Sequence, residues 1–199
     1  MGKANGTNSQ NSAAEFTLSA EEIQQLFDAA PNDRDRAMLR VLYFGGIRRQ
    51  ELCDLDVTDV EAERGRILIR DGKGGKSRAV LLPGTVLSEL GRYTGRRRTG
   101  PLFLSARGKK RLSVRGVNYV VENAGDLAGL TNPNPRLAHI NPHLLRHSFA
   151  RHYLAKGGDI RKLSEQLGHA SIAITHAIYG TASEEEKREE YDRLMQDGG

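Results

Sequence analysis

Apolar residues recur every three or four positions along most of this chain, which is the spacing of helices with one buried face. Ser19 and Glu22 form a capping-box pattern, which predicts a helix that ends near Ala30, before Pro31. The same spacing predicts further helices over about 34–44, 84–93, 113–128, 142–156 and 160–167, and short helical pieces at 48–51 and 171–179.

A different pattern occurs between residues 66 and 82. Residues 66–70 and 78–82 have the composition of strands, and the segment between them, 71–77, is rich in glycine. This pattern predicts a hairpin, and residues 102–104 predict another brief extended piece. Helices therefore predominate, and the expected fold class is mostly α with a small antiparallel β-sheet or hairpin, an α+β fold.

The two ends of the chain lack the periodicity of the middle. Residues 1–15 are rich in Ser, Asn and Gly, and we expect a disordered leader or an expression remnant. Residues 183–199 are acidic, and their apolar stripe is too sparse to stabilise a helix alone. We expect this tail to pack on a partner or on the body of the protein, with a frayed surface helix as the alternative. One domain is thus expected over residues 16–182.

Charge narrows the class of partner. The 199-residue chain has a net charge of +5, but residues 64–115 hold fifteen Lys or Arg residues against Asp71 and Glu89. Such a basic block is typical of nucleic-acid binding, although a solvated surface or a membrane-facing patch produces a similar pattern. No amphipathic anchor accompanies the block, which favours nucleic acid over a membrane. The single cysteine and the lack of membrane-length apolar runs favour a cytoplasmic protein.

Candidate chemistry lies near the C-terminal end of the chain. Asn141 and Pro142 form a strong helix start, which puts His143 in the first turn and Arg146 on the same face. Unpaired amides at a helix N-terminus favour a bound anion and disfavour a charged imidazole. A neutral histidine beside an arginine therefore suits a phosphate whose attacking group must lose a proton.

Five short motifs stand in order along the chain: GIRRQEL at 46–52, GKG at 72–74, HLLRH at 143–147, LGH at 167–169, and Tyr179. Together they resemble the signature of the tyrosine recombinase (phage integrase, Xer-like) family. One such motif would be weak support, but five in family order are strong. The resemblance implies the fold of a tyrosine recombinase catalytic domain and a site-specific DNA recombinase or integrase.

The resemblance implies six catalytic residues, which are Arg48, Lys73, His143, Arg146, His169 and Tyr179. Tyr179 would form a 3′-phosphotyrosyl intermediate, which conserves bond energy so that neither metal nor high-energy cofactor is needed. The two arginines would clamp phosphate oxygens with paired donors, and His169 would add a donor. His143 would accept the phenolic proton, and Lys73 would protonate the leaving oxygen. Lys76 stays open as the alternative to Lys73.

The resemblance also implies supporting residues and partners. Glu51 would position Arg48, and His147 would have a structural role. The partner would be double-stranded DNA, bound by a homotetramer, and the origin would be prokaryotic, viral or a mobile element. The acidic tail at 183–199 would contact a neighbouring subunit. Family members usually carry an N-terminal DNA-clamping domain. The chain is therefore expected to be a catalytic fragment or a minimal protein, with modest and steeply salt-dependent DNA affinity.

Basic residues outside the motifs are expected to contact DNA phosphates, which orients the duplex without selecting its sequence. They are Lys76, Arg78, Arg96, Arg97, Arg98, Lys109, Lys110, Arg111 and Arg115. On the helix expected over 113–128, Arg115 and Asn118 are also candidates for contacts with base edges.

Other functions fit parts of the pattern. His143 and His147, with His139 and His152 nearby, have a spacing that could ligate zinc, but no HExxH glutamate or cysteine cluster accompanies them. A type IB topoisomerase would relax DNA by the same chemistry without defined sites. A DNA-binding module would occupy sites without cutting them.

The spacing of His169 and Tyr179 leaves one question open. A continuous helix between them would separate the two residues by roughly 15 Å, which is too far for one phosphate. Either the chain bends between them, near Thr175, or Tyr179 serves the site of a neighbouring subunit.

Overall fold

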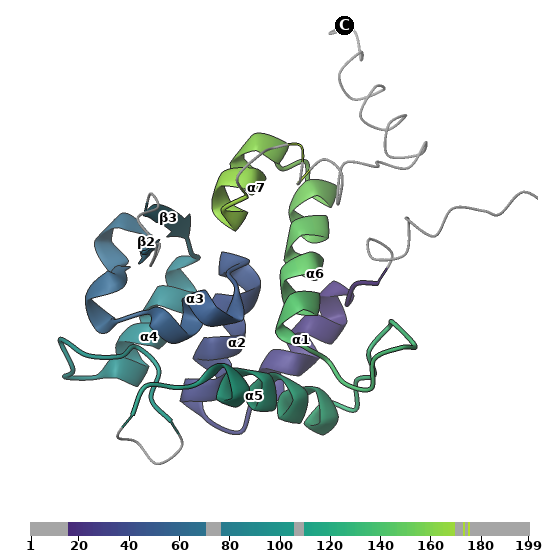
Figure 1. The fold of residues 1–199 in the computed structure, drawn as a ribbon, viewed down its shortest axis with the longest axis horizontal. Coiled ribbons are helices and arrows are strands. Elements are labelled where there is room, and N and C mark those ends of the chain that lie inside the picture. Colours follow the sequence, from purple (N-terminus) through teal and green to yellow (C-terminus); the bar gives the residue numbers. More distant parts are fainter. Residues whose placement is uncertain (1–15, 71–76, 106–109, 170–172, 174, 176–199) are drawn as a thin grey trace, which may run out of the picture.

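The computed structural model describes residues 16–70, 77–105, 110–169, 173 and 175. Within these residues the chain forms seven α-helices and a three-stranded antiparallel sheet (Figure 1). The helices are α1 (Ala20–Asp28), α2 (Asp33–Gly45), α3 (Arg49–Asp54), α4 (Gly84–Thr94), α5 (Val114–Leu127), α6 (Pro142–Ala155) and α7 (Ile160–Leu167). The strands are β1 (Val60–Glu61), β2 (Arg66–Ile69) and β3 (Arg78–Leu81). The expected class, mostly α with a small antiparallel sheet, is confirmed.

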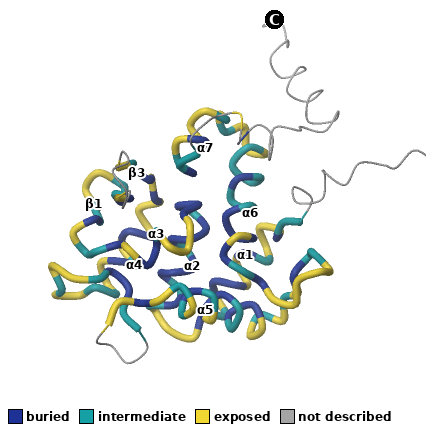
Figure 2. Tube along the Cα trace, in the orientation of Figure 1, coloured by how far each residue is buried: buried dark blue, intermediate teal, exposed yellow. Residues whose placement is uncertain are grey.

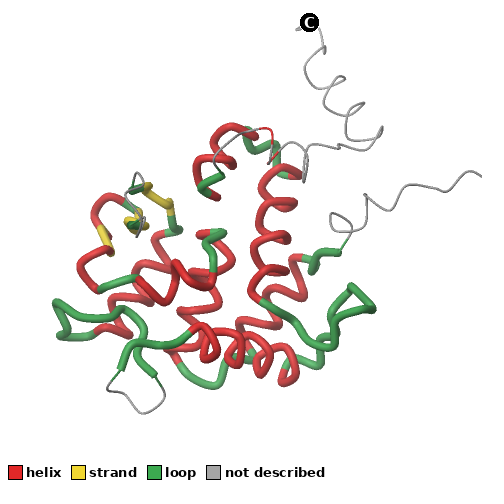
Figure 3. The backbone as a smooth tube through the Cα atoms, in the orientation of Figure 1, coloured by secondary structure: helices red, strands yellow, loops and turns green. Residues whose placement is uncertain are grey.

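Polar cap residues start the helices where the sequence predicts them. Ser19 and Glu22 make a complete capping box at α1. Asn141 accepts a hydrogen bond from the Leu144 amide (3.0 Å) at the start of α6, and Ser113 caps α5 in the same way. A cap of this kind contributes about 1 kcal/mol because it satisfies an otherwise unpaired amide. The predicted ends of these helices agree with the observed ones to within two residues. Figure 3 shows the helices and the loops that connect them.

Helix α2 forms the centre of the core. Helices α1, α4 and α6 pack around it (Figure 1). Most residues of α2 are buried (Figure 2), and its side chains Met38, Leu39 and Leu42 are completely buried. Burial of an aliphatic side chain of this size contributes about 1.5–3 kcal/mol. The position of the C-terminal end of α2 is therefore fixed by the core.

The sheet lies to one side of α2, in the order β1-β2-β3. In the β2–β3 hairpin, Ile67 pairs with Val80, and both side chains are buried. The sequence predicts this hairpin but not β1, whose two residues are too few to form a pattern. Strand β3 is one edge of the sheet, and α7 covers this edge. There the side-chain amide of Gln166 accepts from the Leu81 N–H (3.0 Å) and donates to the Leu81 carbonyl (2.9 Å). Helix α7 is thus fastened to the sheet.

Several predicted features lie outside the described residues. These are the leader at 1–15, residues 71–76 of the glycine-rich turn predicted at 71–77, and the acidic tail at 183–199. The predicted extended piece at 102–104 forms a bridge from Leu104 to Arg111. None of the helices in the described ranges has the length and apolar character needed to cross a bilayer.

Candidate active site

The C-terminal ends of α2 and α7 lie beside α6 (Figure 1), and Arg146 of α6 donates hydrogen bonds to both ends. Gly46 ends α2 with a left-handed backbone, at φ +55°. A Cβ atom on Gly46 would lie 2.7 Å from Cδ2 of Leu167 and 2.8 Å from Cδ1 of Phe149. Glycine is needed here both for the backbone conformation and for the close approach of α6 and α7.

Arg146 lies where these helix ends meet, and only 5% of it is exposed. Its guanidinium donates to the backbone carbonyls of Gly46 and Leu167, the latter at 2.9 Å. Its Nη2 also lies 2.9 Å from Nε2 of His169. The two carbonyls are at the negative ends of helix dipoles, which favour a cation. The guanidinium is therefore held in one place by groups from two other helices.

His169 follows the glycine that ends α7. Its Nε2 faces Arg146, and its Nδ1 lies 2.7 Å from the Oγ1 atom of Thr175. Burial, followed by the positive charges of Arg146 and Arg48, lowers the pKa of His169 to about 4. The imidazole is therefore neutral at neutral pH.

Arg48 precedes α3 and extends toward the same place. Its side chain is 44% exposed, its Nη1 donates to Oε1 of Glu51 (3.0 Å), and its Nη2 approaches the carbonyl of Gly168 (3.4 Å). Arg48 thus contacts the residue directly before His169, and Arg146 contacts His169 itself. Three of the residues predicted to be catalytic lie around one short segment.

Glu51 connects Arg48 to the sheet. Its carboxylate accepts the Arg48 backbone amide (2.7 Å) and two bonds from the guanidinium of Arg78, at 2.9 and 2.8 Å. Burial alone would raise the pKa of Glu51, but the hydrogen bonds from Arg78 and the Arg48 amide, with the two positive charges, lower it overall. The sequence predicts Arg78 as a DNA contact. In the structure its guanidinium instead binds Glu51, so this residue supports Arg48 from within the protein.

The same Arg78 explains the glycine of the LGH motif. A Cβ on Gly168 would lie 2.5 Å from Cζ of Arg78, and the backbone at Gly168 is left-handed, at φ +66°. Any larger residue would displace the guanidinium. This glycine therefore allows α7, β3 and Glu51 to meet.

His143 and His147 extend the site along α6. Their rings make an edge-to-face contact, with centroids 5.6 Å apart. Burial is the main cause of a lowered pKa at both rings; at His143 the charge of Arg146 adds to it, and the pKa of His147 falls to about 4. A neutral imidazole beside an arginine has the properties of a general base for a phenol.

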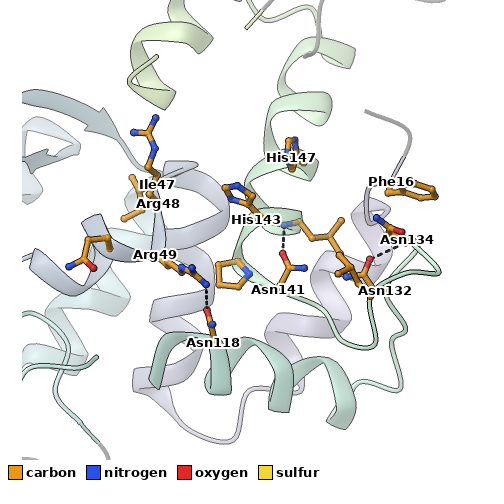
Figure 4. A pocket seen from close by; sticks show the side chains of 14 residues that line it. Phe16, Ile47, Arg48, Arg49, Asn118, Asn132, Asn134, Asn141, His143 and His147 are labelled. Atoms are coloured by element: carbon orange, nitrogen blue, oxygen red, sulfur yellow. Dashed lines mark hydrogen bonds between the residues drawn. The ribbon is translucent and has the colours of Figure 1, made fainter. Parts of the chain in front are cut away.

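A pocket of about 580 Å³ opens beside Arg48 and His143 (Figure 4). Five carboxamide side chains contribute to its wall: Gln50, Asn118, Asn132, Asn134 and Asn141. Arg49 also lines the pocket and donates to Oδ1 of Asn118 (3.3 Å). The pocket gives access to Arg48 and His143 from solvent.

The arginines and lysines predicted to bind DNA differ in exposure and in their hydrogen bonds. Five of them have exposed positions: Arg96, Arg98, Lys110, Arg111 and Arg115. The half-buried Arg97 and the exposed Arg111 each donate two hydrogen bonds to backbone carbonyls of the protein, at 2.7–3.0 Å. Arg97 and Arg111 thus resemble Arg78, because their guanidinium groups form hydrogen bonds with other parts of the protein.

Four predicted site residues lie outside the described part of the chain: Lys73, Lys76, Lys109 and Tyr179. Beyond His169 the structure describes only Ala173 and Thr175. The sequence reasoning did not find the contact of Thr175 with His169, because a lone threonine carries no local signal.

The histidines considered for zinc have other neighbours. His139 lies 3.1 Å from a carboxylate oxygen of Asp126, and His152 lies 2.7 Å from the hydroxyl of Tyr43. Across the described residues, no group of three or more His, Cys, Asp or Glu side chains is placed to hold a metal ion.

Known proteins resemble this chain over most of its length. The phage integrase family matches residues 17–186. The tyrosine recombinase XerA of Pyrococcus furiosus is 38% identical over 184 residues, which are 89% of this chain and 61% of that protein. The chain therefore spans about three-fifths of the length of this curated relative.

Solved structures agree with the sequence match. The crystal structure of XerA recombinase superimposes with a TM-score of 0.75 at 33% identity, over 92% of this chain and 66% of that chain. The XerH site-specific recombinase bound to its difH substrate superimposes with a TM-score of 0.70 at 27% identity, over 91% and 55% of the two chains. The fold is thus that of tyrosine recombinase catalytic domains, as predicted. The chain belongs to the phage integrase family.

Proposed function

We propose that this protein cuts and rejoins DNA at defined sites through a 3′-phosphotyrosyl intermediate on Tyr179. The observation that carries the proposal is the convergence of Arg48, Arg146 and His169 at the ends of α2 and α7. Membership of the phage integrase family supports it. The XerH structure is a pre-cleavage complex with DNA, which supports double-stranded DNA as the substrate here too.

The arginines account for charge in the reaction. When a nucleophile attacks a phosphodiester, negative charge grows on the non-bridging oxygens. Arg48 is exposed and Arg146 is held rigidly beside it, so their paired donors can hold two of these oxygens. Donors fixed before the reaction cost no reorganisation, and the loss of one typically reduces the rate ~10²–10³-fold.

Two proton transfers complete the proposed chemistry. The phenolic oxygen of Tyr179 forms a bond to phosphorus as the bond from phosphorus to the 5′ oxygen breaks. A phenol has a pKa of about 10, so it must lose its proton near neutral pH, and His143 accepts it. Lys73 delivers a proton to the 5′ oxygen, with Lys76 as the alternative. Rejoining is the reverse of these steps and requires neither metal nor high-energy cofactor.

DNA binding and assembly are part of the same proposal. The exposed side chains of Arg96, Arg98, Lys110 and Arg115 hold DNA phosphates and make affinity salt-dependent. Strand exchange needs two duplexes cut together, so the protein acts as a homotetramer on DNA. The tail at 183–199 is proposed to contact the neighbouring subunit.

A nicked trap duplex tests the nucleophile. Cleavage next to a nick releases a short strand, so the covalent complex accumulates and can be seen on a denaturing gel. We expect an adduct with the unchanged chain and none with Tyr179→Phe, which still binds DNA. Tyr119→Phe, at an exposed tyrosine of α5, is the matched control and retains the adduct. An adduct with Tyr179→Phe would place the nucleophile elsewhere, and no adduct with any variant would favour a binding module.

Two further measurements separate the remaining roles. Arg146→Ala should reduce cleavage far more than DNA binding, and equal losses would make it an ordinary phosphate contact. Lys73→Ala should regain activity on a duplex with a 5′-thio leaving group, which needs no proton; failure would direct attention to Lys76. Relaxation of plasmids without a defined site would identify the topoisomerase alternative.

A further inference from the structure

Thr175 is completely buried and makes one specific contact with the proposed site. Its Oγ1 atom lies 2.7 Å from Nδ1 of His169, and the other ring nitrogen, Nε2, lies 2.9 Å from Nη2 of Arg146. Both nitrogens of the imidazole are therefore engaged, one by a guanidinium and one by a hydroxyl. The difference between these two partners determines where the proton of the ring lies.

A guanidinium can only donate hydrogen bonds. In the contact with Arg146, Nε2 of His169 must therefore be the acceptor, and it carries no proton. A neutral imidazole has one proton, so this proton is on Nδ1 and is donated to Oγ1 of Thr175. The described geometry thus assigns the Nδ1–H tautomer to the protein without DNA.

The proposed reaction requires the opposite arrangement. His169 can stabilise a phosphate oxygen only by donation from Nε2. In the protein without DNA, burial and the neighbouring arginines lower the pKa of His169 to about 4. We take the ring to be neutral with a phosphate bound as well. Nδ1 then loses its proton to solvent, Nε2 gains one from solvent, and Nδ1 becomes an acceptor.

A hydroxyl suits both arrangements because it can accept or donate at the same position. We propose that Thr175 is a positioning residue that holds His169 in both tautomers. Its hydroxyl accepts from Nδ1–H in the protein without DNA and donates to Nδ1 when a phosphate takes the Arg146 donors. This role in catalysis rests on the proposed function, whereas the tautomer of the DNA-free protein does not.

NMR of the full chain labelled with ¹⁵N-histidine tests the first half, because protonated and unprotonated ring nitrogens have clearly separate shifts. We expect the Nδ1–H tautomer for His169 in the DNA-free protein. In Thr175→Val the contact with Arg146 still requires an acceptor at Nε2, so we expect the same tautomer with a shifted Nδ1–H signal, because this N–H has lost its acceptor. An Nε2–H tautomer in the unchanged chain, or an identical His169 signal in Thr175→Val, would overturn the inference whatever the protein does to DNA.

The second half is tested with Tyr179→Phe bound to its trap duplex, where we expect the Nε2–H tautomer. An imidazolium, or Nδ1–H unchanged, would overturn the proposed switch. In cleavage assays Thr175→Val should be about tenfold slower, with DNA affinity within about twofold, because one hydrogen bond to the ring is lost.

Two variants separate this role from folding. Thr175→Ser keeps the hydroxyl and should recover cleavage to near that of the unchanged chain. Thr94→Val removes a hydroxyl that bonds the Leu90 carbonyl in α4, and should leave cleavage and the His169 signal unchanged. If Thr175→Ser is as slow as Thr175→Val while both remain folded by circular dichroism, the hydroxyl has no positioning role.

Discussion

Removal of the Arg78 guanidinium should separate two properties that the structure connects, stability and the placement of Arg48. Arg78→Ala removes the guanidinium that donates two hydrogen bonds to the Glu51 carboxylate. The Glu51 side chain is only 16% exposed. Loss of one partner of a buried ion pair costs about 3–5 kcal/mol. Here Arg48 still lies 3.0 Å from Glu51, and solvent reaches part of the carboxylate, so we expect about 2–3 kcal/mol at pH 7.

The pH dependence of this loss follows from the pKa of Glu51. The folded protein lowers that pKa below its ordinary value of 4.5, so the stabilisation is complete above this value and is lost as pH falls through the lower folded pKa. The difference between the unchanged chain and Arg78→Ala should therefore be largest at neutral pH and shrink below about pH 4. Urea unfolding followed by circular dichroism measures it at each pH.

The comparison of Arg78→Ala with Arg78→Lys completes this test. A lysine retains the charge but cannot form two parallel bonds, so about half of the loss should remain. Cleavage should fall in both variants while the salt dependence of DNA binding stays unchanged, since Arg78 faces Glu51. A stability loss under about 0.5 kcal/mol, or a large change in the salt dependence, would contradict this account and return Arg78 to the DNA-contacting surface.

Three further outcomes are expected. Gly46→Ala should abolish cleavage and destabilise the protein by about 2–4 kcal/mol on urea unfolding. Gly65 has a similar backbone conformation, at φ +67°, but no atom lies within 4 Å of an added Cβ, so Gly65→Ala should destabilise the protein by only about 1 kcal/mol. Because burial lowers the pKa of His147 to about 4, unfolding takes up a proton between that value and 6.5, so stability should fall as pH drops through this range. His147→Gln should reduce that slope, and the contribution of His169, whose pKa is also about 4, should remain. Arg97→Ala should lower the melting temperature with little change in DNA affinity, and Arg96→Ala should do the reverse; equal effects would show that the two arginines are not distinguished by their hydrogen bonds.

Local signals in the sequence predict most of the helices correctly. The Asn141 cap and the Ser19 capping box act within one helical turn, so their effects can be read from neighbouring residues. The order of the motifs likewise predicts the fold, because the family to which the chain belongs has a single architecture. Strand β1 was missed because its pairing with β2 depends on position in three dimensions and not on its own two residues.

Contacts between distant residues are what sequence reasoning could not supply. Arg78 reaches Glu51 across 27 positions of the chain, and composition alone does not distinguish such an arginine from one that faces DNA. The contact of Thr175 with His169 spans only six positions, but its meaning depends on Arg146, which lies in another helix. In each case the missing information is which partner a polar side chain finds after folding.

The way α7 is attached has a consequence for the proposed cleavage site. Its buried apolar residues, Leu163 and Leu167, belong to a small cluster with Ala150 that is separate from the main core. Local opening of this helix would withdraw His169 and the Leu167 carbonyl together while the rest of the fold stays closed. Amide hydrogens of α7 should thus exchange faster than those of α2, and a molecule with α7 detached would hold DNA without the means to nick it.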